Sequence, residues 1–243
     1  MNNKLFLTSI ILLLTYSVNA QGWGKNKKVR GNGHVVTETR STSDYDGIGV
    51  GGSFDVILVK GKEGKITLEG EENILPYIET KVKNGHLKIE FKKNTNIRTT
   101  RKLTVTVPFE DIKKLSLGGS GNVISKAVIE ATDLKVSIGG SGNIEAKVSA
   151  ETLKASVAGS GNIKLSGNAN ELKCSIAGSG DVKAYELETD TTRASIAGSG
   201  NVRVYVNTKI KASIAGSGSV YYKGKPTYVN SNSAGSGGIV DKN

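Results

Sequence analysis

The sequence predicts an all-β fold, a single-stranded parallel β-helix with coils of about 19 residues and a strand-rich part that caps its N-terminal end. Three observations predict this class. A glycine-rich corner recurs at a nearly constant spacing, apolar residues alternate with polar ones on both sides of each corner, and 31 of the 243 residues are glycine while only 3 are proline. Scarce proline argues against a collagen-like or proline-rich disordered chain, and the 5% aromatic content indicates a core of small aliphatic side chains.

The recurring corner reads Gly-Ser-Gly and is followed in four copies by Asn. We call its first residue the corner glycine. Successive corner glycines are 21, 19, 19, 20, 18 and 19 residues apart. Self-similarity at a nearly fixed period is typical of a solenoid, in which each unit buries its apolar face against its neighbours. The corner glycines are Gly119, Gly140, Gly159, Gly178, Gly198, Gly216 and Gly235.

The residues on each side of a corner alternate with period two, which is typical of a half-buried strand. Apolar side chains stand four and two residues before the corner glycine and four residues after it; in the coil of Gly140 they are Val136, Ile138 and Ile144. A leucine-rich repeat is excluded because its leucine spacing and its helical return are both missing. We therefore expect strand, corner and strand in every coil, wound right-handed by analogy with parallel crossover connections.

The position three residues after the corner glycine is polar in most coils, and side chains at this position can stack on one another in neighbouring coils. Because neighbouring coils of a β-helix lie about 4.8 Å apart, we expect the asparagines at this position to form a ladder whose amides bridge successive coils. Other residues at this position, Asp181, Ser219 and Gly238, are expected to break the ladder. The serine hydroxyls of the corners are expected to bond to local backbone. The ladder residues are Asn122, Asn143, Asn162 and Asn201.

The chain divides into an export signal, a leader and one domain. Residues 1–20 are typical of a secretory signal peptide, since Lys4 precedes an apolar run too short to span a bilayer comfortably and Val18-Asn19-Ala20 fits a cleavage site. Residues 21–45 are expected to be a polar, flexible leader. The β-helix domain is predicted at residues 46–240, with irregular first coils at 46–110 and regular repeats at 111–240. No transmembrane helix is expected in the mature chain.

Residues 46–110 follow the logic of the repeats less regularly. Gly51-Gly52-Ser53 is a degenerate corner, Asn84-Gly85 is typical of a hairpin turn, and Pro108 is expected to end the last strand before the repeats. This part is expected to cover the open end of the core, because a solenoid needs a cap that protects its strand edges. Further strands are predicted at residues 56–59, 65–69, 78–83, 87–91 and 103–107.

Several segments together resemble a known family. The runs GIGVGGSFDVILVKG, ILPYIETKVKNGHLKIEF and LTVTVPFEDIKKLSLGGSGNV, followed by the AGSGNI-type repeats, are similar to the "putative auto-transporter adhesin, head GIN domain" family. The resemblance covers residues 46–240, nearly all of the mature chain. It implies an exported β-helical protein, often from Bacteroidetes-type bacteria. It implies adhesion by name only, with no catalytic residue and no defined ligand to transfer.

Alignment of the repeats shows where part of the net charge of +11 is concentrated. Every coil from the first regular corner to the sixth carries a cation five residues before its corner glycine, on an outward position. We call this set the cationic column. Stacked like charges oppose one another, so two explanations stand side by side: a stripe that binds an anionic polymer, or a solvated face that keeps the sheet soluble. The column comprises Lys114, Lys135, Lys154, Lys173, Arg193 and Lys211.

Other chemistry is not indicated. Residues 47–52 match G-x-G-x-x-G, but a strand follows where a dinucleotide site needs a helix. Calcium is not expected, because only Asp181 is acidic among the seven corners. His34 and His86 lie far apart in the sequence, and Cys174 occupies an inward position as a small buried thiol. We therefore expect no catalytic residue, no metal and no cofactor.

The predicted function is an exported, non-catalytic adhesion or binding module of the bacterial cell envelope, located in the periplasm, at the cell surface or outside the cell. Its expected partner is an acidic polysaccharide, a lipopolysaccharide or a host or cell-surface component. Nucleic acid is not expected, because the protein is exported and aromatic residues are few. A carbohydrate-active enzyme similar to a polysaccharide lyase, or a purely structural envelope protein, stays an open alternative. The sequence leaves the oligomeric state open.

Overall fold

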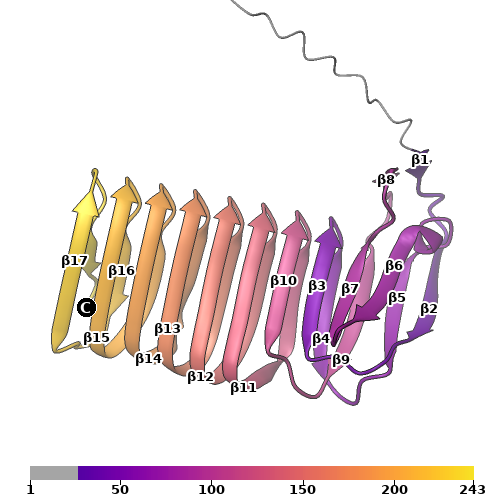
Figure 1. The fold of residues 1–243 in the computed structure, drawn as a ribbon. Helices are drawn as coiled ribbons and strands as arrows, with labels where there is room; N and C mark the ends of the chain where they lie inside the picture. Colours follow the sequence, from indigo (N-terminus) through magenta and orange to yellow (C-terminus); the bar gives the residue numbers. More distant parts are fainter. Residues whose placement is uncertain (1–26) are drawn as a thin grey trace, which may run out of the picture.

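The structure, a computed structural model, describes residues 27–243 and is an elongated solenoid of stacked β-coils (Figure 1). This confirms the predicted all-β class. In the described residues the only helical element is one turn of 3-10 helix, η1 (Leu75–Tyr77). None of these residues forms a helix long and apolar enough to cross a membrane. The predicted signal peptide at residues 1–20 and the first residues of the leader lie outside the described part.

The regular coils pair in parallel throughout, as predicted. Each long strand runs from one corner to the next and bends midway, where the inward alternation changes phase. In β12, for example, Val148 and Leu153 are both buried on either side of the bend. The strands are β10 (Lys114–Gly119), β11 (Asn122–Gly140), β12 (Asn143–Gly159), β13 (Asn162–Gly178), β14 (Asp181–Gly198), β15 (Val202–Gly216), β16 (Val220–Lys223), β17 (Tyr228–Ala234) and β18 (Ile239–Asp241).

Each coil therefore has two arms. The leading arm precedes the corner glycine and the trailing arm follows it. Both arms point their apolar residues into one narrow core, where the stacked aliphatic side chains are almost completely buried. Val136, Ile138 and Ile144 are at most 2% exposed. The apolar core ends at the last coil. There Ser231 and Ser233 take the inward positions that Ala212 and Ile214 occupy in the coil before, and all of β17 is exposed.

The corners need glycine for two reasons. Gly140 has a φ of +142°, a region that other L-residues rarely adopt, and a Cβ there would meet the carbonyl oxygen of Gly119 at 2.5 Å. That carbonyl accepts hydrogen bonds from the backbone N–H groups of Ser141 (3.0 Å) and Gly142 (2.9 Å). The expectation that corner hydroxyls bond to local backbone is wrong for the described residues: the backbone N–H of Ser141 makes the bond, and its side chain is exposed.

The first coil precedes the regular repeats. It consists of β3 (Gly47–Gly52) and β4 (Asp55–Lys60), and Gly52 lies opposite Gly119, so the degenerate corner stacks on the regular ones. On the far side of this coil, β7 (His86–Phe91) continues the sheet of leading arms and β9 (Thr104–Phe109) continues that of trailing arms, both in parallel. The parallel pairing of the leading arms and that of the trailing arms therefore both continue beyond the first coil towards the N-terminal end.

Antiparallel strands then end both sheets. β6 (Ile78–Lys83) covers the edge of β7 through the turn at Asn84 and Gly85, whose φ values of 51° and 72° suit the predicted hairpin. β5 (Lys65–Glu71) covers the edge of β9. Pro108 does not end β9, contrary to expectation. It is tolerated there because the pairing of β9 with β5 covers only Thr104–Thr106.

The described part of the expected flexible leader, residues 27–45, is structured, which corrects that prediction. β2 (Val35–Ser41) adds antiparallel to β5, and β1 (Lys27–Arg30) pairs with β8 (Thr95–Arg98) in a separate two-stranded sheet. The Glu71 carboxylate, 1% exposed, accepts hydrogen bonds from the backbone N–H of Gly33 and from the backbone and hydroxyl of Thr100. The buried Glu71 carboxylate therefore holds the leader, through Gly33, against the N-terminal cap of the solenoid. No local pattern in residues 21–45 indicates this contact.

Candidate functional site

The cationic column lies along the outer face of the leading arms. Strand register places Lys114, Lys135 and Lys154 opposite one another, and the series continues through Lys173, Arg193 and Lys211. Their neighbours in the strands, such as Val136 and Ala155, point inward and are buried. Because the coils stack about 4.8 Å apart, the six cations form one line along the solenoid axis. The line ends at Asn230, which stands opposite Lys211.

One carboxylate, that of Glu171, pairs with the fourth and fifth cations of this line. Glu171 lies 2.8 Å from the Lys173 Nζ and 3.1 Å from the Arg193 Nε. The hydrogen bond from Lys173, supported by the charge of Arg193, holds the pKa of Glu171 below its usual value. Within residues 27–243, the other four cations of the column have no carboxylate within 4.0 Å. A line of uncompensated, partly exposed charges repels itself, and a bound anion relieves that repulsion.

A strip of small residues runs beside the column. The outward position two residues closer to the corner is serine in six successive coils, and the next outward position is glycine or alanine. The strip is therefore flat, and the long cationic side chains rise along one border of it. Its serines are Ser116, Ser137, Ser156, Ser175, Ser195 and Ser213. The cationic column predicted from the sequence is thus bordered by a flat strip of serine, glycine and alanine, which was not predicted as part of the site.

The strip deepens into a groove at the C-terminal coils. An open hollow of about 490 Å³ is lined by Lys173, Arg193 and Lys211 together with serines, asparagines and the small residues Cys174, Ala194 and Ala212, and most of its surface is apolar. Sequence reasoning missed the polar part of this lining, namely Ser195, Ser213, Asn230 and Asn232. The signal that could have found these asparagines is the alignment itself, because Asn230 and Asn232 fall on the register positions of Lys211 and Ser213. The groove combines three cations with neutral hydrogen-bonding groups.

The ladder asparagines predicted from the sequence lie at the start of the trailing arms, whereas the cationic column lies on the leading arms. The amide Nδ2 of Asn143 donates to Oδ1 of Asn122, and Nδ2 of Asn162 donates to Oδ1 of Asn143, each at 3.0 Å. Asn122 in turn donates to Asp55 of the first coil at 2.8 Å. Side-chain amides that pass one hydrogen bond per coil keep the corners in register.

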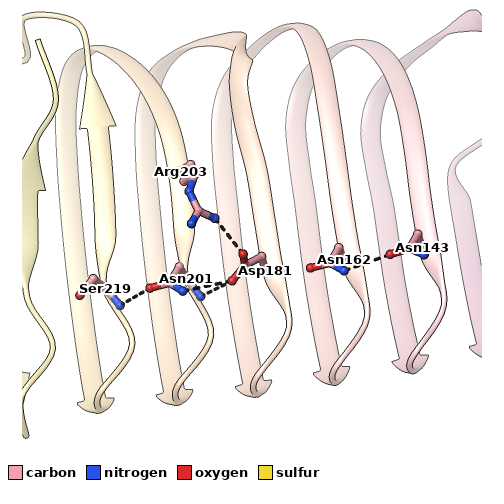
Figure 2. A network of polar contacts seen from close by, with 6 residues as sticks. All are labelled: Asn143, Asn162, Asp181, Asn201, Arg203 and Ser219. Atoms are coloured by element: carbon pink, nitrogen blue, oxygen red, sulfur yellow. Dashed lines mark hydrogen bonds and ion pairs between the residues drawn. The ribbon is translucent and has the colours of Figure 1, made fainter.

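Asp181 interrupts the series on one side only, and the later coil donates to the earlier one on both sides of the gap (Figure 2). No hydrogen bond joins Asn162 to Asp181, but Oδ1 of Asp181 accepts from the backbone N–H (2.9 Å) and the amide (3.2 Å) of Asn201. Asn201 then accepts from the backbone N–H of Ser219 at 3.1 Å. The other carboxylate oxygen of Asp181 holds Arg203 at 2.8 Å. The expected break at Asp181 therefore lies on its N-terminal side only, and Ser219 joins the series through its backbone.

The remaining candidate residues do not assemble into a reactive site. Cys174 is 4% exposed, and burial raises the pKa of its thiol to about 12. His34 contacts Glu72 at 3.1 Å, and His86 lies 3.8 Å from Asp46, in separate places on the cap. Residues 27–243 contain no group of three His, Cys, Asp or Glu side chains placed to hold a metal ion. The arrangement that stands out chemically is the cationic column with its groove.

Comparisons with known proteins agree with this architecture. The family described as "putative auto-transporter adhesin, head GIN domain" matches residues 44–226. A Bacteroides fragilis structure described as a putative adhesin is 23% identical with a TM-score of 0.84, covering 88% of this chain and 100% of that one. A Parabacteroides distasonis structure described as a putative lipid binding protein is 29% identical with a TM-score of 0.72, covering 89% and 100%. No curated protein sequence matches the chain.

Proposed function

Since the chain belongs to the auto-transporter adhesin head GIN domain family, we propose that it is an exported, non-catalytic binding module of the bacterial cell envelope that holds anionic glycans along the cationic column. The single observation that carries this proposal is the register of the column, which aligns six cations on one outward face. Among the described residues only one carboxylate, that of Glu171, pairs with the column, at Lys173 and Arg193. The adhesin description of the family and of the Bacteroides fragilis structure supports the binding role.

The linear arrangement suits a linear polyanion. A globular ligand would meet one or two coils, whereas a chain with repeating acid groups can follow successive cations along the axis. The groove at Lys173, Arg193 and Lys211 adds serine hydroxyls and amides, which can pair with sugar hydroxyls while the cations pair with carboxylate, sulfate or phosphate. Each contact is weak in water, and the affinity accumulates from their number.

The test replaces four charges of the column by neutral residues of similar length. In the variant Lys135→Gln, Lys154→Gln, Lys173→Gln and Arg193→Gln, retention on immobilised polygalacturonate should fall strongly at low ionic strength. The binding of the unmodified protein should weaken as salt rises, because exposed charges are screened over about 8 to 10 Å at physiological ionic strength.

The matched control removes the same amount of charge elsewhere. Lys62, Lys83, Lys126 and Lys147 are exposed and have no carboxylate within 4.0 Å in the described chain. Changing all four to Gln leaves the column intact, and retention should decrease only slightly. Equal retention of both variants refutes the column as the binding site and leaves net charge as the cause. Release of shortened sugar products from the bound polymer contradicts the non-catalytic role.

A further inference from the structure

Tyrosines gather in the last coils of the solenoid. Residues 27–243 contain seven tyrosines, and five of them lie between residues 185 and 228. Three of these, Tyr185, Tyr205 and Tyr221, are half-buried on the outer face of the trailing arms. This face belongs to the sheet of the asparagine ladder, and the cationic column lies on the sheet of the leading arms.

Cations alternate with these rings. Register places Tyr221 opposite Arg203 and Tyr205 opposite Lys223 on adjacent strands. The Arg203 guanidinium and the Lys242 ammonium each lie 5.5 Å from the centre of the Tyr221 ring, and the Lys223 ammonium lies 5.1 Å from that of Tyr185. We call this set the tyrosine surface: Tyr185, Tyr205, Tyr221, Lys183, Arg203, Lys223 and Lys242.

The solenoid itself does not require these rings. Counted from the corner glycine, the same outward positions of earlier coils carry Glu145 and Lys147 in β12 and Lys164 and Ser166 in β13, over the same kind of buried core. Aromatic residues at outward positions of the last coils therefore add nothing that the fold needs. Exposed aromatic rings grouped with charged side chains are a common composition of binding surfaces.

The surface is also hollowed where the strand register shifts. The pairing of β14 with β15 slips after Ala184, and an open hollow of about 220 Å³ lies beside it. The hollow is lined by Lys164, Lys183, Tyr185, Arg203 and Glu186, whose carboxylate lies 3.9 Å from the Lys164 Nζ. Arg203 is fixed there by its ion pair with Asp181, whereas Lys183, Lys223 and Lys242 have no carboxylate within 4.0 Å in the described residues. The hollow thus has an aromatic wall, and its carboxylate, Glu186, pairs with Lys164, so that Lys183 is the lining cation without a carboxylate partner among the described residues.

We propose that the tyrosine surface is a second, independent ligand site, which binds an acidic sugar residue of an extended glycan. The flat face of a sugar ring, formed by its C–H groups, packs on Tyr205 and Tyr221, and its carboxylate or sulfate pairs with Lys183 and Lys223. This assignment goes beyond the proposed function, since it lies on the other sheet and uses aromatic packing as well as charge. Two sites on opposite sheets let one molecule bridge two glycan chains.

The experiment uses as its background a column-neutral variant, in which all six cations of the column are changed to Gln, so that any remaining binding is assigned to other surfaces. Tetragalacturonate is titrated by calorimetry, and Tyr205→Thr with Tyr221→Thr is added in that background. Threonine suits an exposed strand position. We expect the column-neutral protein to keep measurable binding and the added pair to weaken it by about 10-fold or more, because the packing of the sugar ring on both aromatic side chains is lost. The matched control, Tyr228→Ala, removes an exposed tyrosine of β17 that contacts Lys209 and Lys211, and should leave the binding unchanged.

A second measurement needs no tyrosine substitution. Addition of tetragalacturonate to the column-neutral protein should shift the aromatic NMR signals of Tyr205 and Tyr221 and leave those of Tyr45 and Tyr77 in place. Absence of residual binding, an unchanged affinity of the Tyr205→Thr, Tyr221→Thr variant, or unshifted signals of these two rings overturns the second site. None of these results refutes the column, which is tested by the loss of binding between the unmodified and column-neutral proteins.

Discussion

Two adjacent glycines of one corner should respond in opposite ways to the same substitution. Gly139 and Gly140 both lie in β11, and each is changed to Ala. At Gly139 a Cβ meets nothing within 4 Å, and the next coil already carries Ala158 at the opposite position. At Gly140 the φ of +142° disfavours alanine, and the Cβ would lie 2.5 Å from the carbonyl oxygen of Gly119.

The magnitude follows from these contacts. A left-handed backbone conformation costs a non-glycine residue about 1 to 2 kcal/mol, and moving the Gly119 carbonyl weakens two backbone hydrogen bonds worth about 1 kcal/mol each. Gly140→Ala should therefore lower the free energy of unfolding by about 3 to 4 kcal/mol. Gly139→Ala should leave it unchanged or raise it by up to about 1 kcal/mol, because alanine restricts the unfolded chain.

Denaturant unfolding, followed by circular dichroism, measures both variants against the unmodified protein. The unfolding midpoint of Gly140→Ala should shift to a clearly lower denaturant concentration. The midpoint of Gly139→Ala should equal or exceed that of the unmodified protein. The cost at Gly140 lies in its backbone conformation and in the close approach of the neighbouring coil, neither of which applies at Gly139. A difference of less than about 1 kcal/mol between the two variants therefore refutes this explanation.

Three further predictions concern buried or stacked groups. Burial acts to raise the pKa of Glu71, but hydrogen bonds from Thr100, Gly33 and Arg101 outweigh it and lower the pKa to about 2. The carboxylate therefore stabilises the fold above the unfolded pKa near 4.5, and this contribution disappears as the pH falls from about 4.5 towards 2. Glu71→Gln should cost about 3 kcal/mol in unfolding experiments at pH 7 and much less at pH 3; a penalty independent of pH contradicts the assignment. Cys174 should react with a thiol reagent at pH 8 only after denaturation, because burial raises its pKa to about 12; rapid labelling of the native protein refutes this. Asn143→Ala should lower the unfolding free energy by about 1 to 2 kcal/mol, because it removes one donated and one accepted side-chain bond; an unchanged midpoint means that the ladder contributes no stability.

The regular coils were predictable in detail because their physics is local and repeated. Alternation around each corner determines which side chains point inward, so Val136, Ile138 and Ile144 could be assigned to the core without coordinates. The same alignment located the cationic column, since residues at equivalent positions of a solenoid must lie side by side. Pro108 and the leader were misjudged for a different reason. Whether a proline is tolerated depends on where the pairing of β5 ends, and β2 is ordered by a strand that follows it by about 30 residues.

The polar contacts depended on geometry that the alignment does not contain. Position alone suggested that Asp181 interrupts the asparagine ladder, but a carboxylate has only acceptors, so it loses the bond to Asn162 and keeps the bonds to Asn201. The groove beside Lys211 and the tyrosine surface likewise combine residues from three or more coils, whose side chains meet only after stacking.

The sequence by itself determined the class of fold, the length of a coil, the corners and the inward and outward positions of the regular repeats, because glycine and period-two alternation act within a few residues. The tertiary structure alone decided how the N-terminal end is covered, how Glu71 holds the leader, and which cations keep their charge uncompensated. These features depend on pairing and hydrogen bonding between residues far apart in the chain, which no local pattern of the sequence encodes.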